Sequence, residues 1–152
     1  YDTALKTGNR ALDIVLMEKA LFCKNHDICW TCMADGEHLD FMRVEDIYAI
    51  FGNALDNAIT AVMKVTDPDK RVVSTKLIIQ SDLMVIQVQN YYEGKLQFEK
   101  GLPLTTKKNK ADHGYGVKSI RYTAEKYNGT ITVQTKNQIF MLQILIPVPN
   151  SA

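Results

Sequence analysis

The sequence predicts an α+β protein: a two-layer sandwich in which a mixed, mostly antiparallel sheet carries helices on one face. Three observations lead to this expectation. Pairs of strand-like segments follow one another through short turns, without helical crossovers between them. The helix-like segments are apolar on one face only. Hydrophobic residues make up 46% of the 152 residues, enough for one sizeable core. We therefore expect residues 1–152 to form a single domain.

The first helix is expected over residues 8–24. Its apolar side chains recur at helical spacing, and one lysine, Lys19, falls in the same row. Thr7 or Asn9 is a suitable N-cap. Residues 28–33 are short and apolar-rich, which is typical of a strand, and Asp35-Gly36-Glu37 indicates a turn.

Residues 44–65 form the clearest predicted helix, with one broad apolar face. The residues of that face are Ile47, Ile50, Phe51, Ala54, Leu55, Ala58 and Val62. Asp67-Pro68-Asp69 ends the segment, because proline cannot continue a helix. Two strands with alternating polar and apolar positions follow, over 72–80 and 83–90.

Residues 91–115 contain glycines, a proline and the lysine-rich run Lys107-Lys108-Asn109-Lys110, so we expect a long mobile loop here. A helix is predicted from Gly116 to Tyr127 and ends at Asn128-Gly129. A closing hairpin is predicted from residues 130–135 and 139–147.

The formal net charge is only +1, so any electrostatic specificity must be local. Neither nucleic-acid binding nor an acidic disordered chain is favoured. No apolar run approaches the ~18 residues that cross a bilayer, and no signal peptide opens the chain. Residue 1 is Tyr, so we expect the chain to be a piece of a longer protein.

The first candidate site is Asn53-Ala54-Leu55-Asp56-Asn57-Ala58. Asn53 and Asn57 are four residues apart on a predicted helix, so they point to the same side. Amide carbonyl oxygens suit a hard cation such as Mg²⁺. The alternative is that both amides simply face solvent.

The second candidate is His113-Gly114-Tyr115-Gly116-Val117, which follows the basic loop and opens a predicted helix. Glycines let a backbone approach a phosphate closely, and a helix N-terminus presents free N–H groups to it. A third feature is Asn90 at a strand end with Gly94 four residues later.

In this order the three features resemble the motifs of the GHKL superfamily of ATP-binding domains, which includes histidine kinases, gyrase-type topoisomerases, Hsp90-type chaperones and MutL-type repair proteins. The N box matches 53–58, the G1 box falls on 90–94 and the G2 box on 114–116. The closing segment from Asn128 to Pro147 resembles the last strands of histidine kinase catalytic domains. The likeness covers almost the whole chain.

Within the superfamily, the chain most resembles the peptide-sensing, Agr-like quorum kinases of Gram-positive bacteria. The segment Lys6-Thr7-Gly8-Asn9 through Leu16 and Lys19 is similar to the one that follows their phosphoacceptor helices. Residues 1–8 would then be the tail of an upstream dimerisation region. The run from Thr106 to Ile120 is similar to their lid and G2 region.

The resemblance implies a role for each matching residue. Asn57 would ligate Mg²⁺, and Asn53 would lie beside the phosphates as the catalytic residue of the N box. Asn90 would stand where the family has the Asp that binds the adenine amino group, with Gly94 completing the G1 box. The expected phosphate contacts at the lid are Lys107, His113, Gly114, Tyr115, Gly116 and Val117.

The sequence departs from the family pattern in G1, where Asn90 replaces Asp and Tyr92 replaces the first Gly. An Asn carbonyl still accepts a hydrogen bond, but the charge-assisted bond is lost. The aromatic F box of many histidine kinases is not evident. Gyrase-type and Hsp90-type members use a Glu at the position of Asn53 to activate water, and an amide cannot act as that base, so fast ATP hydrolysis is not expected.

Cys23, His26, Cys29 and Cys32 recur every third residue, which on paper is a zinc set. Residues three apart on a strand face opposite sides, so Cys29 and Cys32 should diverge. Cys29-Trp30-Thr31-Cys32 also mimics a redox motif, but no helix N-terminus is predicted there to stabilise a thiolate. We therefore expect reduced core thiols, and we take His26-Asp27 as incidental and not as a phosphoacceptor.

The leading hypothesis is the catalytic domain of a two-component sensor histidine kinase. It would bind ATP and Mg²⁺ and transfer the γ-phosphate to a histidine on absent upstream dimerisation helices, with a response regulator as the next partner. The domain would be cytoplasmic and would touch neither nucleic acid nor membrane, while the full-length protein would be membrane-anchored. The alternatives are a non-catalytic module on the same fold, an anti-sigma-type serine kinase, and a zinc or redox protein.

Overall fold

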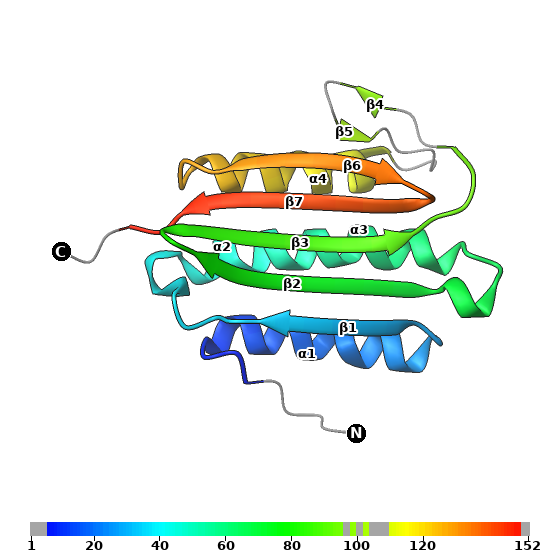
Figure 1. The fold of residues 1–152 in the computed structure, drawn as a ribbon, viewed down its shortest axis with the longest axis horizontal. Coiled ribbons are helices and arrows are strands. Elements are labelled where there is room, and N and C mark those ends of the chain that lie inside the picture. Colours follow the sequence, from blue (N-terminus) through cyan, green and yellow to red (C-terminus); the bar gives the residue numbers. More distant parts are fainter. Residues whose placement is uncertain (1–5, 96–97, 100–101, 104–109, 150–152) are drawn as a thin grey trace.

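A five-stranded sheet forms one layer of the molecule (Figure 1). The computed structural model describes residues 6–95, 98–99, 102–103 and 110–149, with backbone alone for 98–99, 102–103 and 110–115. The strands are β1 (Cys29–Ala34), β2 (Val72–Gln80), β3 (Leu83–Tyr91), β6 (Thr130–Lys136) and β7 (Ile139–Pro147), in the order β1-β2-β3-β7-β6. β1 runs parallel to β2 and all other pairs are antiparallel, so the predicted mixed, mostly antiparallel sheet is confirmed.

Both predicted hairpins are present, and their turns contain residues with positive φ. Ser81 has φ 55° between β2 and β3, and Asn137 and Gln138 have φ 53° and 65° between β6 and β7. Tight hairpin turns of this kind match the right-handed twist of the flanking strands. β3 and β7 then pair over their full length, from Leu83 opposite Pro147 to Tyr91 opposite Ile139.

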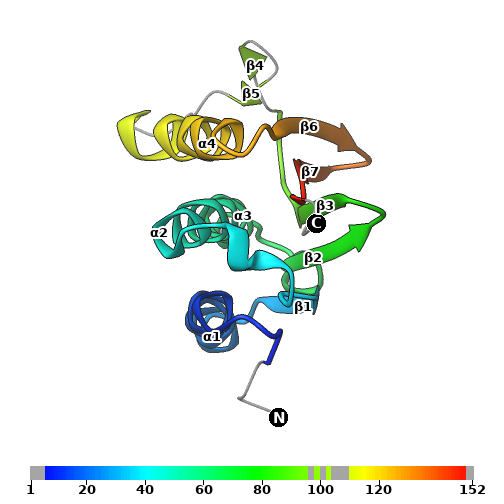
Figure 2. The ribbon, with the colours of Figure 1, turned by 90° about the vertical axis from the view of Figure 1, so that its left-hand side faces the viewer.

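Three main helices cover one face of the sheet, as predicted (Figure 2). They are α1 (Arg10–Asn25), α3 (Asn53–Met63) and α4 (Lys110–Glu125), and the short α2 (Val44–Ile47) leads into α3. α3 lies between α1 and α4 in both views (Figures 1 and 2). None of the helices in the described ranges is long and apolar enough to cross a membrane.

The predicted cap of α1 is Asn9, whose side-chain carbonyl accepts from the backbone N–H of Leu12 at 2.9 Å. Thr7 supports this turn by donating from Oγ1 to Asp13 at 2.7 Å. Gly36 N–H donates to the Thr7 carbonyl at 2.8 Å, which ties the helix start to the turn after β1. The Asn9 bond satisfies a donor that the first turn of a helix leaves free, and the other two hold the segment before α1 in place.

The predicted helix over 44–65 is not regular. A π-helical turn, η2 (Tyr48–Gly52), separates α2 from α3. π turns insert one extra residue into a helix and are frequent near functional sites. The apolar face survives this insertion, since Ile50, Phe51 and Leu55 are all fully buried.

Arg71, just before β2, ties the C-terminal ends of α1 and α3 together. Its guanidinium donates to the carbonyls of His26 at 2.7 Å, Val62 at 3.0 Å and Val65 at 3.3 Å. Helix ends leave carbonyls without intrahelical partners, and a cation is the most favourable donor for them.

The prediction of one long loop over 91–115 is wrong in two places. A short hairpin pairs β4 (Phe98–Glu99) with β5 (Leu102–Pro103). α4 begins at Lys110 and not at Gly116. Glycine inside a helix costs only about 1 kcal/mol, so Gly114 and Gly116 do not stop the helix from starting six residues earlier. Lys107 lies outside the described residues.

A buried carboxylate joins the C-terminal end of α4 to the start of α2. Asp46 is only 4% exposed; it accepts from Lys126 Nζ at 3.1 Å and from the Tyr127 hydroxyl. The same hydroxyl accepts from the backbone N–H of Arg43 at 3.0 Å. Burial on its own would raise the pKa of Asp46, but the hydrogen bonds from Tyr127 and Lys126 outweigh it and hold that pKa below its ordinary value.

We expect Tyr127→Phe to lower the free energy of unfolding by about 1 to 3 kcal/mol, because it removes one partner of a buried carboxylate and one of a backbone donor. Urea denaturation measures this. The pKa of Asp46 is lowered in the folded chain, so ionised Asp46 stabilises the fold at any pH above its unfolded-state pKa. That stabilisation is lost as the pH falls through the folded-state pKa. The difference from wild type should therefore narrow below about pH 4.

Tyr122→Phe is the matched control, since Tyr122 lies in the last part of α4, just before Tyr127, and is 68% exposed. It should change stability by less than about 0.5 kcal/mol. Equal effects of the two substitutions would contradict a role for the Asp46 network.

Candidate functional site

A groove of about 570 Å³ lies between α1 and α3 and reaches α4 at Gly116. It is lined by the following residues: Glu18, Lys19, Leu21, Phe22, Asn25, His26, Asn53, Asp56, Asn57, Ile59, Thr60 and Gly116. Three amides, several charges and a glycine of a neighbouring helix thus meet in one concave surface, a common arrangement for a small-molecule site.

The structure brings Asn53 and Asn57 to the same groove, as their spacing predicted. Asn53 Nδ2 donates to the Ala49 carbonyl, one turn back, at 2.7 Å. That bond orients the amide, so that its Oδ1 lies on the side of α4: a Cβ added to Gly116 would be 3.8 Å from it. The N box and the G2 glycine therefore face each other across the α3–α4 boundary.

Asn90 is buried in the sheet, at 3% exposure, near the end of β3. Its Nδ2 donates to the Tyr91 carbonyl at 3.1 Å. Its Oδ1 is the one buried side-chain polar atom in the described part of the chain that has no hydrogen-bond partner. Buried polar atoms are nearly always paired, so this orphaned acceptor calls for a donor from a ligand or water.

Gly94, four residues later, has φ +86°, which favours glycine, and open space where a Cβ would be. Its carbonyl accepts from Gln138 Nε2 at 3.3 Å, and the Tyr92 carbonyl accepts from the same group at 2.9 Å. The end of β3 is therefore held to the β6–β7 turn. Neither Asn90 nor Gly94 is among the residues that line the α1–α3 groove.

The backbone of His113, Gly114 and Tyr115 belongs to the first two turns of α4, and not to a loop preceding it. Val117 is 2% exposed and joins the core. Of the two motif residues whose side chains the structure describes, Gly116 and Val117, Gly116 lines the groove.

Sequence reasoning missed the contribution of α1 to the groove. Lys19 Nζ lies 2.7 Å from Asp56 Oδ1, which joins α1 to the N box. A signal was present, because Lys19 falls in the row that otherwise carries the apolar residues of that helix. A single lysine in such a row does not reveal its partner 37 positions further on.

The Cys-His-Cys-Cys series does not converge. Among the described residues, the group able to share a metal ion contains none of the four. Cys29 is exposed and Cys32 half-buried, as expected for opposite faces of β1. His26 caps α1 and stacks on Phe22 at 3.8 Å between ring centroids. The three cysteines are free thiols, but the expectation of core thiols is wrong for Cys29, which is exposed on the outer face of β1. The zinc and redox alternatives lose their structural basis.

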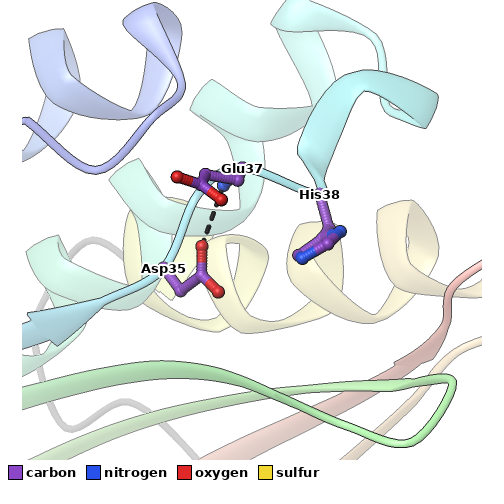
Figure 3. A group of neighbouring side chains, drawn as sticks. All are labelled: Asp35, Glu37 and His38. Atoms are coloured by element: carbon purple, nitrogen blue, oxygen red, sulfur yellow. Dashed lines mark hydrogen bonds between the residues drawn. The ribbon is translucent and has the colours of Figure 1, made fainter.

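The group that does converge is Asp35, Glu37 and His38, after β1 (Figure 3). Their ligand atoms lie within 4.8 Å of one another, and the Glu37 N–H donates to Asp35 Oδ1 at 3.1 Å. All three side chains are exposed, and none lines the α1–α3 groove. We assign no ligand to this surface group.

The chain belongs to the GHKL domain family, whose sequence profile matches residues 42–147. Its fold is that of histidine kinase catalytic domains. One nucleotide-free form of the catalytic domain of histidine kinase ThkA superposes with a TM-score of 0.68 at 17% identity, covering 94% of this chain and 93% of that one. Another such form gives 0.69 at 16% identity, over 93% and 95%.

The histidine kinase AdeS of Acinetobacter baumannii gives a TM-score of 0.59 at 12% identity, over 92% of this chain and 64% of AdeS. At these identities the likeness shows the fold alone. Comparison with curated protein sequences finds no significant match.

We expect one fast-reacting thiol when the native chain meets a disulfide reagent at neutral pH. Burial raises the pKa of Cys32 to about 11, and that of Cys23 also to about 11 despite the opposing charge of Lys19. Thiolate is the reactive form, so both should react slowly. Cys29→Ser should abolish the fast phase of the reaction, because Cys29 is the exposed thiol. Cys32→Ser is the control and should keep the fast phase. Two fast-reacting thiols in the folded chain would contradict this prediction.

Proposed function

We propose that this chain is the ATP-binding catalytic domain of a two-component sensor histidine kinase. It would pass the γ-phosphoryl group of ATP to an imidazole nitrogen of a histidine on upstream dimerisation helices and release ADP. Membership of the GHKL family and the histidine kinase fold support this proposal.

The observation that carries the proposal is the orphaned Oδ1 of Asn90. It stands where the family's adenine-binding Asp is expected. The exocyclic amino group of adenine is a donor, so it supplies the bond that Oδ1 lacks. A guanine presents a carbonyl oxygen at the same place, which would leave two acceptors facing each other. The residue present therefore fits an adenine nucleotide.

The N box fits the metal and the phosphates. Asn57 lines the groove and has an amide oxygen to offer Mg²⁺, which prefers oxygen ligands and retains several waters. Asn53 lies one turn before it, with its Oδ1 on the side of Gly116. When bound, Mg²⁺ would supply charge neutralisation to the phosphates.

Asn53, Asn57 and Asn90 contribute position and hydrogen bonds, not covalent chemistry. Phosphoryl transfer requires an aligned acceptor and compensated charge more than it requires an acid or base from the binding domain. An amide at Asn53 cannot deprotonate water, which would preserve ATP for the histidine acceptor.

The finer assignment is to the Agr-like, peptide-sensing branch, based on the segment from Lys6 to Lys19 and on the altered G1 box. In that setting the partners are the upstream phosphoacceptor helices and a response regulator. The domain would lie in the cytoplasm as part of a membrane-anchored kinase.

A second candidate is a non-catalytic nucleotide-binding or interaction module on the same fold. The observation that favours it is the replacement of the G1 Asp and first Gly by Asn90 and Tyr92. It predicts no phosphoryl transfer even when an intact acceptor segment is supplied.

Calorimetry with ATP, with and without Mg²⁺, tests the proposal. We expect Mg²⁺-dependent binding, and we expect Asn57→Ala to weaken it by about tenfold or more, because a metal ligand is lost. Asn57→Asp should retain the Mg²⁺ dependence, since a carboxylate is also an oxygen ligand. Gln80→Ala, an exposed amide on β2, is the matched control and should bind as wild type does. No binding by the folded chain at millimolar ATP would overturn the proposal.

The base preference gives an independent prediction. Wild type should bind ATP more tightly than GTP, and Asn90→Leu should reduce that preference by about tenfold, because the acceptor for the adenine amino group is gone. Competition against a fluorescent ATP analogue measures both affinities. An unchanged ATP to GTP ratio in a folded Asn90→Leu chain would rule out the assigned role of Asn90.

A further inference from the structure

An ion pair in the α1–α3 groove joins Asp56 of the N box to Lys19, which lies outside the three motifs. Lys19 Nζ lies 2.7 Å from Asp56 Oδ1 and 3.5 Å from Glu18 Oε1. The lysine side chain is 14% exposed, whereas those of Asp56 and Glu18 are 61% and 72% exposed. The cation is thus enclosed between the two helices, and the carboxylates are open to the groove.

The charges of the groove oppose an anionic ligand, and Lys19 halves that opposition: Glu18, Asp56 and Lys19 together carry one negative charge, where the two carboxylates alone would carry two. The carboxylates of Asp56 and Glu18 both line the groove. The amides of Asn53 and Asn57 line it as well, and Asp56 immediately precedes Asn57. Without the lysine, two negative charges would face incoming phosphates; Lys19 cancels the one adjacent to Asn57. Charges separated by less than a Debye length of about 8 to 10 Å interact even in physiological salt.

Holding the helices together does not require this ion pair. Arg71 already ties the C-terminal ends of α1 and α3 through the carbonyls of His26, Val62 and Val65. Apolar packing joins the same helices, with Val15, Leu16 and Leu55 buried in one core. An exposed partner such as Asp56 also gives an ion pair little value for stability. The pair therefore calls for a role other than fold stability.

We propose that Lys19 is a charge-compensating positioning residue of the nucleotide site: it neutralises Asp56, and thereby sets how well the groove accepts the phosphates beside Asn53 and Asn57. The inference rests on the proposed function and extends it to α1. It assigns opposite effects to the two members of the pair, since the lysine favours the anionic ligand and the aspartate disfavours it.

The protonation of Lys19 is consistent with this role. Burial, the largest influence, lowers the pKa of Lys19, but the hydrogen bond and charge of Asp56, together with Glu18, outweigh it and leave the pKa raised. The side chain is therefore a cation throughout the neutral range.

The test measures affinities of Lys19→Met, Asp56→Asn and the double variant for adenosine, AMP, ADP and a non-hydrolysable ATP analogue with Mg²⁺. We expect Lys19→Met to weaken the ATP analogue by about fivefold and Asp56→Asn to strengthen it by about as much, the Coulomb effect of one charge in a solvent-exposed groove. The double variant should return to near the wild-type value. Adenosine affinity should change by less than about twofold in all three, and the effects should shrink in 1 M salt, where the Debye length is about 3 Å.

Lys19→Arg is the conservative control and should bind all four ligands as wild type does, because it retains the charge. The inference would be overturned if Asp56→Asn and Lys19→Met both weakened binding of the ATP analogue and weakened adenosine binding equally. The ion pair would then be a structural one. If Lys19→Met does not fold, the gain expected in Asp56→Asn decides the question alone. If wild type binds neither ATP nor its analogue, the proposed function fails, and this inference fails with it.

Discussion

Burial of the apolar face of α3 is the constraint on which the rest of the molecule depends. Leu55, Ala58 and Val62 are all at most 1% exposed beneath the helix layer, and α3 itself lies between α1 and α4 (Figure 2). Once that face is fixed against the sheet, the opposite face can only point outward. Asn53 and Asn57 occupy the outward face, so the same packing that builds the core also aims the candidate ligands.

The parts of the fold that local chemistry determines were predictable from sequence. Alternating patterns identified β2 with β3 and β6 with β7, and the Asn9 cap marked the start of α1 to within two residues. The start of α4 was missed, because Gly114 and Gly116 resemble loop residues and nothing local shows that the helix continues through them. The π turn at 48–52 was missed because the apolar residues Ile47, Ile50, Phe51, Ala54 and Leu55 keep the spacing of a regular α-helix through it.

In the candidate site, too, the features set by local sequence were predictable and those set by helix packing were not. The amides of the N box and the Asn90 position were identified as ordered motifs, and the structure places Asn53, Asn57 and Gly116 in one groove. The Lys19–Asp56 pair was not identified, because it depends on how two helices pack and not on spacing within either. A neutral Asn90 also suits its surroundings: an unpaired buried carboxylate would cost far more than an unpaired carbonyl. With Asn at this position, the buried acceptor without a partner therefore carries a smaller desolvation penalty than a carboxylate would.

The extra residue of the π turn makes the number of residues between α2 and α3 important for the candidate site. Each residue of an α-helix advances the chain by about 100°, since there are 3.6 residues per turn. A π turn takes up its extra residue within one widened turn, so α2 and α3 keep nearly the same phase across it. The Ala49 carbonyl that orients the Asn53 amide belongs to this turn, and shortening Tyr48–Gly52 by one residue would change the position of that acceptor. Within the turn, Ile50 and Phe51 are fixed by the core, whereas Tyr48 is exposed. In this family, gaps in an alignment would therefore be as informative about function here as changes of residue type.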